Sequence, residues 1–318
     1  MRILITGISG FAGSHLAEYF LAEGKHELFG SIKWRSDRQN IVHIQKELRL
    51  YECDIRDAFA MNSIISEVKP DRIFHLAAQS YVPFSWRAPQ ETLTTNIIGE
   101  VNLFEAVRQA RINPLIHIAG SSEEYGMVYP EEVPIEETHI LRPLSPYGVS
   151  KVAQDLLGYQ YFKSYGLKII RTRAFNHTGP RRGVVFATSN FAKQLIEIEK
   201  GKRKPTIYVG NLEAVRDFLD VRDVARAYAL ALEKGKAGEV YNISSGEGIK
   251  IQDMLDKLIS LSNVDLKIEK DPERLRPSDV GLLIGSPKKF QKETGWKPEI
   301  PFDQTLKDLL DYWREKIQ

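Results

Sequence analysis

The chain has 318 residues, enough for one large α/β unit or for a nucleotide-binding domain with a smaller partner domain. Its 44 Lys and Arg residues nearly balance its 42 Asp and Glu residues, and the net charge of +2 gives no reason to expect a nucleic acid or membrane partner. The single cysteine, Cys53, excludes an internal disulfide and a thiolate-rich metal site, and no apolar run approaches the ~20 residues that span a bilayer.

The N-terminal apolar run is too short for a signal peptide, because it breaks into glycines at Gly7. The seven histidines show no metal-ligand spacing such as His-x-x-x-His. We therefore expect a cytoplasmic protein without a metal site.

A short strand, a glycine-rich turn and a helix open the chain. Residues 2–6 predict a buried parallel strand, and residues 14–23 have the apolar spacing of a helix. Glycines between them let the backbone approach a pyrophosphate, which the free amides and dipole of the helix N-terminus hold. The spacing Gly-x-x-Gly-x-x-Gly is one residue longer than the common dinucleotide fingerprint, but its place on the first turn supports that function. The cofactor contacts predicted here are Gly7, Gly10, Phe11 and Gly13.

The second predicted strand, residues 27–32, is followed by cations where NAD-binding proteins place a carboxylate for the adenosine ribose. A ribose 2′-phosphate requires cations, and Lys33 and Arg35 supply them. We therefore predict NADP as the cofactor. A solvated basic loop is the alternative interpretation.

Two further strands are predicted over residues 48–52 and 72–76, each followed by candidate cofactor contacts. The first set suits the adenine edge, and the second has small side chains where larger ones would block the dinucleotide. A helix predicted over residues 89–110 carries Asn96, which either orients the active site or is a satisfied structural amide. The predicted contacts are Asp54, Ile55, Leu76, Ala77 and Ala78.

A fifth strand, residues 114–119, delivers Ser121 and Glu123 to the carboxyl edge of the sheet. Open α/β sheets bind their ligands at this edge. We therefore treat both side chains as candidate catalytic groups.

The next helix places a tyrosine and a lysine one turn apart. Ser145 is a good N-cap and Pro146 suits the first helical position, so Tyr147 and Lys151 share one face. An ammonium group near a phenol favours the ionised phenol, so we expect Lys151 to lower the pKa of Tyr147 and make it a proton acceptor. Alone, this pair indicates only an amphipathic surface. Beside a dinucleotide fold and a serine, it indicates hydride-transfer chemistry.

The pattern changes after a sixth predicted strand, residues 167–174. Loop-like residues follow, and then short strands mixed with helices over residues 191–200, 221–232, 251–261 and 301–317. We predict an α/β protein with a Rossmann-type NADP-binding domain over residues 1–175, to which residues of about 211–245 return. Residues 176–318 form a smaller α/β substrate-binding domain in this prediction.

Together the motifs resemble the extended short-chain dehydrogenase/reductase family over essentially the whole chain. Within it, the chain is similar to the GDP-mannose 4,6-dehydratases and the GDP-4-keto-6-deoxymannose reductases. The segments that carry this likeness are Ser121-Ser122-Glu123, Tyr147 to Lys151, Phe175-Asn176-His177, Gly210-Asn211-Leu212 with Arg216-Asp217, and Arg276-Pro277-Ser278-Asp279 with Gly295-Trp296-Lys297-Pro298.

The resemblance implies a GDP-sugar substrate and a homodimer or homotetramer. It also implies that the loop of Lys33 and Arg35 reaches a neighbouring subunit, where Arg181 and Arg182 could meet it. The substrate contacts assigned on this basis are Ser80, Ser85, Ser122, Asn176, Arg216 and Arg276.

Within the family we expect a GDP-mannose 4,6-dehydratase, a hydro-lyase that forms GDP-4-keto-6-deoxymannose. By the resemblance, Tyr147 would accept the C4 hydroxyl proton, while Glu123 removes the C5 proton and, with Ser121, returns a proton to the departing C6 hydroxyl. The alternative is an NADPH-dependent GDP-4-keto-6-deoxymannose reductase, alone or bifunctional, in which Ser121 and Tyr147 polarise and protonate a 4-keto group. A non-catalytic NADP-sensing scaffold is more remote, because Tyr147 and Lys151 are both present.

Overall fold

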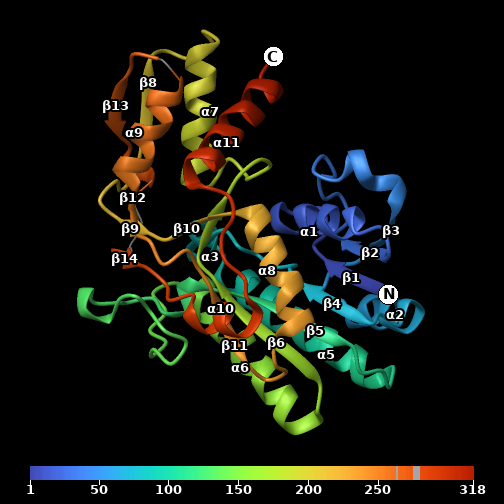
Figure 1. Ribbon diagram of the computed structural model, residues 1–318. Coiled ribbons are helices and arrows are strands. Elements are labelled where there is room, and N and C mark those ends of the chain that lie inside the picture. The colour runs from blue at the N-terminus through green and yellow to red at the C-terminus, as the bar shows by residue number, and fades with distance from the viewer. Residues whose placement is uncertain (263, 275–279) are drawn as a thin grey trace.

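The computed structural model describes residues 1–262, 264–274 and 280–318. Its centre is a parallel seven-stranded sheet with the order β11-β6-β5-β4-β1-β2-β3 (Figure 1). The strand order reverses between β1 and β4, which is the doubly wound arrangement of a Rossmann fold. The predicted fold class is therefore confirmed. The strands are β1 (Arg2–Thr6), β2 (Glu27–Ile32), β3 (Leu48–Glu52), β4 (Arg72–His75), β5 (Leu115–Ser121), β6 (Lys168–Ala174) and β11 (Val240–Ile243).

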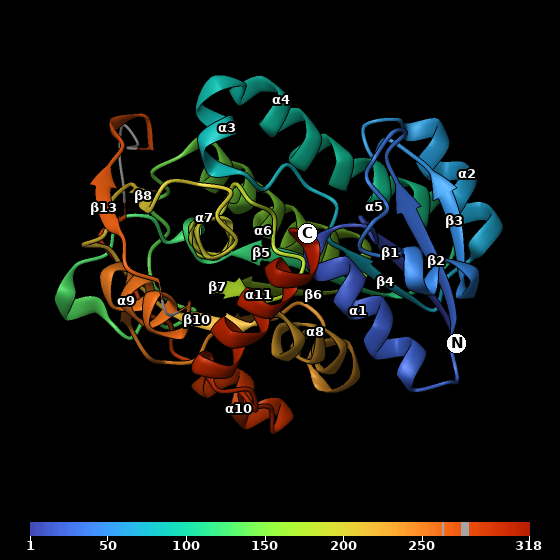
Figure 2. The same cartoon turned by 90° about the horizontal axis from the view of Figure 1, so that it is seen from above.

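Helices cover both faces of this sheet, and Figure 2 shows them on its two sides. Alternate residues of β1 point to opposite faces, so Ile3 and Ile5 join one apolar core and Leu4 joins the other. Both faces are thus buried, as a parallel sheet requires. The first core includes α1 (Phe11–Ala22), α8 (Val221–Lys234) and α10 (Lys288–Thr294); the second includes α2 (Ala58–Val68), α5 (Gly99–Gln109) and α6 (Pro146–Tyr165).

A smaller α/β part stands at the carboxyl edge of the sheet, at the top of Figure 1. A third apolar core joins α7 (Ala187–Glu199), α9 (Ile251–Ser262) and α11 (Phe302–Lys316). Its short strands pair with one another rather than with the large sheet. They are β7 (Asn176–Thr178) with β10 (Phe218–Asp220), β8 (Thr206–Val209) with β13 (Lys267–Lys270), and β9 (Val215–Arg216) with β12 (Ile249–Lys250) and β14 (Leu282–Leu283).

The one long helix predicted over residues 89–110 is wrong in detail. The structure has α3 (Val82–Arg87), α4 (Pro89–Leu93), a π-helical turn (Thr94–Ile98) and then α5. Tertiary contacts account for the wide turn, because Asn96 inside it accepts a hydrogen bond from the backbone N–H of Gln79 (2.8 Å) and donates one to Ser150 Oγ (2.8 Å). Such π-turns often mark functional sites.

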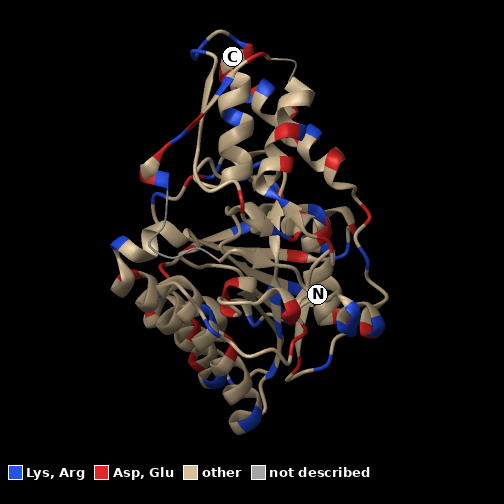
Figure 3. Cartoon of the chain, turned by 90° about the vertical axis from the view of Figure 1, so that its left-hand side faces the viewer, with Lys and Arg blue, Asp and Glu red and all other residues tan. Residues whose placement is uncertain are grey.

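Short 3₁₀ turns complete the described chain at Val42–Glu47, Ser122–Glu124, Pro130–Glu132 and Pro272–Arg274. Acidic and basic residues are interspersed over the molecule in Figure 3, in keeping with the small net charge. Among the described residues, the helices are all too short or too polar to cross a bilayer.

Candidate active site

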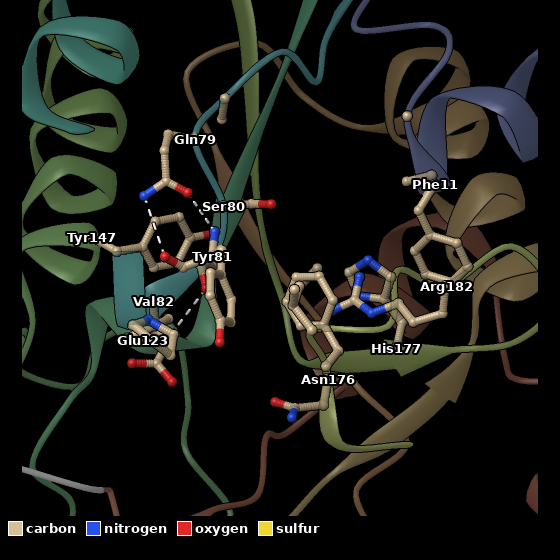
Figure 4. A pocket seen from close by; sticks show the side chains of 18 of the residues that line it. Phe11, Gln79, Ser80, Tyr81, Val82, Glu123, Tyr147, Asn176, His177 and Arg182 are labelled. Atoms are coloured by element: carbon tan, nitrogen blue, oxygen red, sulfur yellow. Dashed lines mark hydrogen bonds between the residues drawn. The ribbon is translucent and has the colours of Figure 1, made fainter. Parts of the chain in front are cut away.

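One large cavity of about 1400 Å³ lies between the carboxyl edge of the sheet and the smaller part. Parallel sheets of this topology bind ligands there, because the strand order reverses at the same place. The residues of the glycine turn line this cavity, and so do Tyr147 and Glu123. Figure 4 shows Tyr147 and Glu123 at one wall and Phe11, His177 and Arg182 at the facing wall.

The glycine turn has no room for side chains. Gly7 has a φ of +71°, and a Cβ on it would lie 2.9 Å from the Cα of Ala77. A Cβ on Gly13 would lie 2.4 Å from the backbone oxygen of Gly7. Since α1 begins at Phe11, its free amides face the cavity, as an anion site requires. The predicted contacts Gly7, Gly10, Phe11 and Gly13 all line the cavity.

The next predicted contacts divide into two groups. Lys33 lines the cavity, with its Nζ 3.6 Å from the carboxylate of Asp54. Arg35 is exposed and lies outside the cavity lining, because its guanidinium stacks on the ring of Trp34 at 4.2 Å. The structure thus does not bring Arg35 to the site. The other predicted contacts that line the cavity are Asp54, Ile55, Leu76, Ala77 and Ala78.

Ser121, Tyr147 and Lys151 converge as the spacing predicts. Ser145 caps α6 by accepting a hydrogen bond from Gly148 N at 3.0 Å, and Pro146 is the first helical residue. The Tyr147 hydroxyl lies within hydrogen-bonding reach of the Ser121 hydroxyl. Lys151 donates to the backbone oxygen of Ala119 (2.8 Å), with its Nζ 5.9 Å from the centre of the Tyr147 ring.

The expected effect on Tyr147 is wrong for the free protein. Burial raises the pKa of Tyr147 well above its ordinary value, because it disfavours the phenolate more than the Ser121 hydrogen bond favours it. Burial also lowers the pKa of Lys151 to about 8. The phenol therefore holds its proton at neutral pH.

Glu123 and its neighbour Glu124 occupy different environments. The Glu124 carboxylate is fully buried, accepts the backbone N–H of Ser121 (2.7 Å) and pairs with Arg173 at 3.0 Å. It therefore caps the short turn that positions Ser121. Glu123 instead lines the cavity, and α6 packs closely on its backbone: a Cβ on Gly148 would lie 2.7 Å from the Glu123 oxygen. The phenol and this carboxylate consequently share one wall (Figure 4).

Of the substrate contacts that the resemblance implies, some line the cavity and others do not. Ser80, Ser122, Asn176 and Arg216 line the cavity. Ser85 lies outside the lining, because its hydroxyl is fully buried and donates to the backbone oxygen of Val82 at 2.7 Å. Arg276 lies outside the described residues.

The sequence of residues 4–309 matches the family described as GDP-mannose 4,6 dehydratase. The chain belongs to this family. A GDP-6-deoxy-D-mannose reductase of Pseudomonas aeruginosa is 33% identical over 317 residues, which cover 100% of this chain and 98% of the relative. A GDP-mannose 4,6-dehydratase of Vibrio cholerae is 31% identical over 349 aligned positions, covering 97% of this chain and 92% of that protein. The solved structure of RMD from Pseudomonas aeruginosa complexed with NADPH has a TM-score of 0.86 and 32% identity, covering 99% of each chain.

Two residues of the cavity wall, His177 and Arg182, were named in the sequence analysis but not assigned to the site: His177 only as part of a family segment, and Arg182 only as a contact of a neighbouring subunit. His177 stacks on Phe11 with ring centres 5.9 Å apart, and burial lowers its pKa to about 4, so it is neutral at pH 7. The Arg182 guanidinium lies 3.5 Å from the Phe186 ring and 4.8 Å from the Phe11 ring. Burial lowers the Arg182 pKa to about 10, which leaves it charged at pH 7. The sequence feature that could have indicated these residues is the polar run after β6, which was interpreted only as a loop.

Arg181 points away from this cavity. It forms an ion pair with Glu18 and hydrogen bonds with His15, both on α1 of the same chain. The idea that Arg181 meets a neighbouring subunit's cofactor loop is therefore not supported by its contacts. This ion pair instead holds α1 against the loop that carries Arg182.

Proposed function

We propose that this protein is an NADPH-dependent reductase of GDP-4-keto-6-deoxymannose. The observation that carries the proposal is the Tyr147 hydroxyl, which is buried at the cavity wall and lies within hydrogen-bonding reach of the Ser121 hydroxyl. A phenol in this state is a proton donor, and a ketone that accepts hydride needs one. Support also comes from the Pseudomonas reductase, whose 317 aligned residues nearly equal the 318 of this chain.

The residues present fit a dinucleotide with a 2′-phosphate. The glycine turn offers free amides and no side chains to a diphosphate, and Lys33 supplies a cation beyond β2 where a carboxylate would select NAD. NADPH, when bound, supplies the hydride. Across the cavity, the Arg182 guanidinium beside Phe11 is placed to reach the diphosphate of the same ligand.

The chain's own groups then complete the reduction of a ketone at C4. Ser121 donates a hydrogen bond to the ketone oxygen, and Tyr147 transfers its proton to that oxygen as the C4–H bond forms. The product is the secondary alcohol, and the enzyme is left with a phenolate. The Lys151 ammonium stabilises this phenolate until a solvent proton replaces the lost one.

The other end of the cavity suits a nucleoside diphosphate sugar. Asn176 lines it from β7, and Arg216, Lys270 and Arg274 line it from β9, β13 and the 3₁₀ turn Pro272–Arg274. Arginine forks match phosphate oxygens in geometry and charge. We therefore place the GDP portion between the two parts of the chain, with residues 1–175 and the returning segment of about 211–245 as the cofactor domain and residues 176–318 as the nucleotide-sugar domain.

One observation favours GDP-mannose 4,6-dehydratase as a second candidate. Glu123 lines the cavity on the same wall as Tyr147, where a dehydratase needs a base for the C5 proton. A reductase has no use for such a base. The two activities therefore differ in how much they depend on Glu123.

The test supplies the purified protein with each substrate and identifies the products by mass. A reductase converts GDP-4-keto-6-deoxymannose only when NADPH is added, and Glu123→Gln leaves most of that turnover. A dehydratase forms GDP-4-keto-6-deoxymannose from GDP-mannose without added reductant, and Glu123→Gln abolishes it. Conversion of GDP-mannose with no turnover of the keto sugar would refute the reductase proposal.

We further propose a homo-oligomer in the cytoplasm. Val149, Leu156 and Tyr159 on α6 are 46%, 56% and 44% exposed, and apolar groups on one helix favour burial against a second copy. The only cysteine of the chain is a buried free thiol, which suits a reducing compartment.

A further inference from the structure

We propose that Glu100 is the counter-ion of Lys151, and that its carboxylate keeps the Lys151 side chain protonated at working pH. Glu100 is not itself part of the cavity lining, whereas Lys151 is, so Glu100 acts through Lys151 as a positioning residue. The consequence for turnover rests on the reductase function proposed above. The pairing itself rests on the packing and charge of the interior.

The π-turn and the start of α5 pack alongside α6. Asn96 donates to Ser150 Oγ at 2.8 Å, and one turn later Glu100 lies beside Gln154. Lys151 lies three residues before Gln154 on the same helix, and residues at this spacing are neighbours on a helix surface, so Glu100 lies on the side of α6 that carries the lysine. Both side chains are buried, with Glu100 0% and Lys151 4% exposed.

Among the described residues, Lys151 is the cation that most favours the ionised form of Glu100. Neither of its carboxylate oxygens has a hydrogen-bond partner within ordinary limits among the described residues. Burial raises the pKa of Glu100 well above its ordinary value, and the charge of Lys151 opposes that rise. A buried carboxyl of this kind stays ionised only when a cation is close.

The neighbouring carboxyl groups are already matched by arginines. Asp155 pairs with Arg171 and, at 2.8 Å, with Arg173, and Glu124 pairs with Arg173 at 3.0 Å. Two carboxyl groups thus contact two guanidinium groups, although burial and then the charge of Asp155 raise the pKa of Glu124 well above its ordinary value. Among the described residues of this cluster, the buried cation and the buried carboxyl that remain are Lys151 and Glu100.

The other titratable groups that face Lys151 do not provide a counter-charge. His75 on β4 and His117 on β5 lie near it, but burial lowers the pKa of each to about 3, so both are neutral at pH 7. Glu124 favours the charged form of the lysine, yet its charge is shared with Arg173. Removal of Glu100 therefore removes the main group that offsets the burial of the ammonium.

The decisive experiment measures the Lys151 pKa directly by NMR of side-chain-labelled lysine in the full chain. The Lys151 signal is identified by its loss in Lys151→Arg. For the wild type we expect a Lys151 pKa of about 8, because burial lowers it. In Glu100→Gln, which keeps the shape and removes the charge, we expect a fall of about one pH unit or more.

Glu105→Gln is the matched control, because it removes the same charge from the same helix at a site paired with Arg108 (2.7 Å). It should leave the Lys151 pKa unchanged. If Glu100→Gln and Glu105→Gln give the same Lys151 pKa, the pairing is wrong. If Glu100→Gln does not fold, infrared spectra of Lys151→Met provide the test. Without the lysine we expect Glu100 to become protonated, which adds one carboxylic-acid band relative to the wild type. The absence of such an added band would overturn the proposal.

The pH dependence of turnover tests the role of Glu100 independently of the lysine titration. With the reductase reaction, the decline of kcat at alkaline pH should begin about one pH unit lower in Glu100→Gln than in wild type or Glu105→Gln. Absence of any reductase turnover would refute the proposed function alone, because the lysine titration does not require it. Unshifted alkaline decline in an active Glu100→Gln enzyme would contradict the role of Glu100.

Discussion

Replacing Arg182 with glutamine should weaken NADPH binding by about 10- to 100-fold. The guanidinium lies between the rings of Phe186 and Phe11, 3.5 and 4.8 Å from their centres, and the second ring begins the helix whose N-terminus faces the cavity. A hydrogen bond between charged groups contributes roughly 1.5–3 kcal/mol. At about 1.4 kcal/mol for each factor of ten in affinity, loss of that bond gives the stated range.

The assay is a fluorescence titration of the protein with NADPH at fixed ionic strength, repeated at two salt concentrations. Arg203→Gln is the control, because Arg203 pairs with Glu197 at 2.8 Å outside the cavity lining. It should change the dissociation constant less than twofold. An Arg182→Gln protein that unfolds normally and binds NADPH as tightly as Arg203→Gln would show that Arg182 does not touch the cofactor.

Three further predictions test other parts of the site. Tyr147→Phe should lower the reductase kcat by about 10²- to 10⁴-fold with little change in NADPH affinity, because it removes only the transferable proton; wild-type kcat in this variant would exclude Tyr147 as the donor. Lys33→Gln should reduce the preference for NADPH over NADH, measured as the ratio of kcat/KM values, and an unchanged ratio would place the 2′-phosphate elsewhere. Leu156→Glu should shift the mass in solution, measured by light scattering, toward the monomer; an unchanged mass would place the interface on another face.

Local patterns predicted much of the fold. The parallel sheet, the glycine turn and the capped helix of Tyr147 follow from short apolar runs and from residues with strong positional preferences, such as Ser145 as an N-cap and Gly166 at φ +71° as the helix stop. The irregular helix around Asn96 was not predictable in this way. Its π-turn depends on hydrogen bonds to Gln79 and Ser150, which are distant along the chain.

In the candidate site, too, some residues were predictable from local sequence and others were not. Residue type and spacing indicated Tyr147 and Lys151, because one helical turn places them on the same face, and Ser121, because it ends a strand at the edge where such sheets bind ligands. Only the tertiary structure showed that Glu124 caps a turn while Glu123 lines the cavity, since the direction of a side chain after a strand depends on what packs against it.

The amino-acid sequence by itself therefore determined the sheet, the glycine turn and the candidate reacting side chains. The tertiary structure decided the protonation states of these side chains. Burial raises the pKa of Tyr147 and lowers the pKa of Lys151, so it favours the neutral form of both groups. The burial of a group depends on all the segments that surround it. No single stretch of sequence contains that information, because desolvation and partner charges are contributed by residues far apart in the chain.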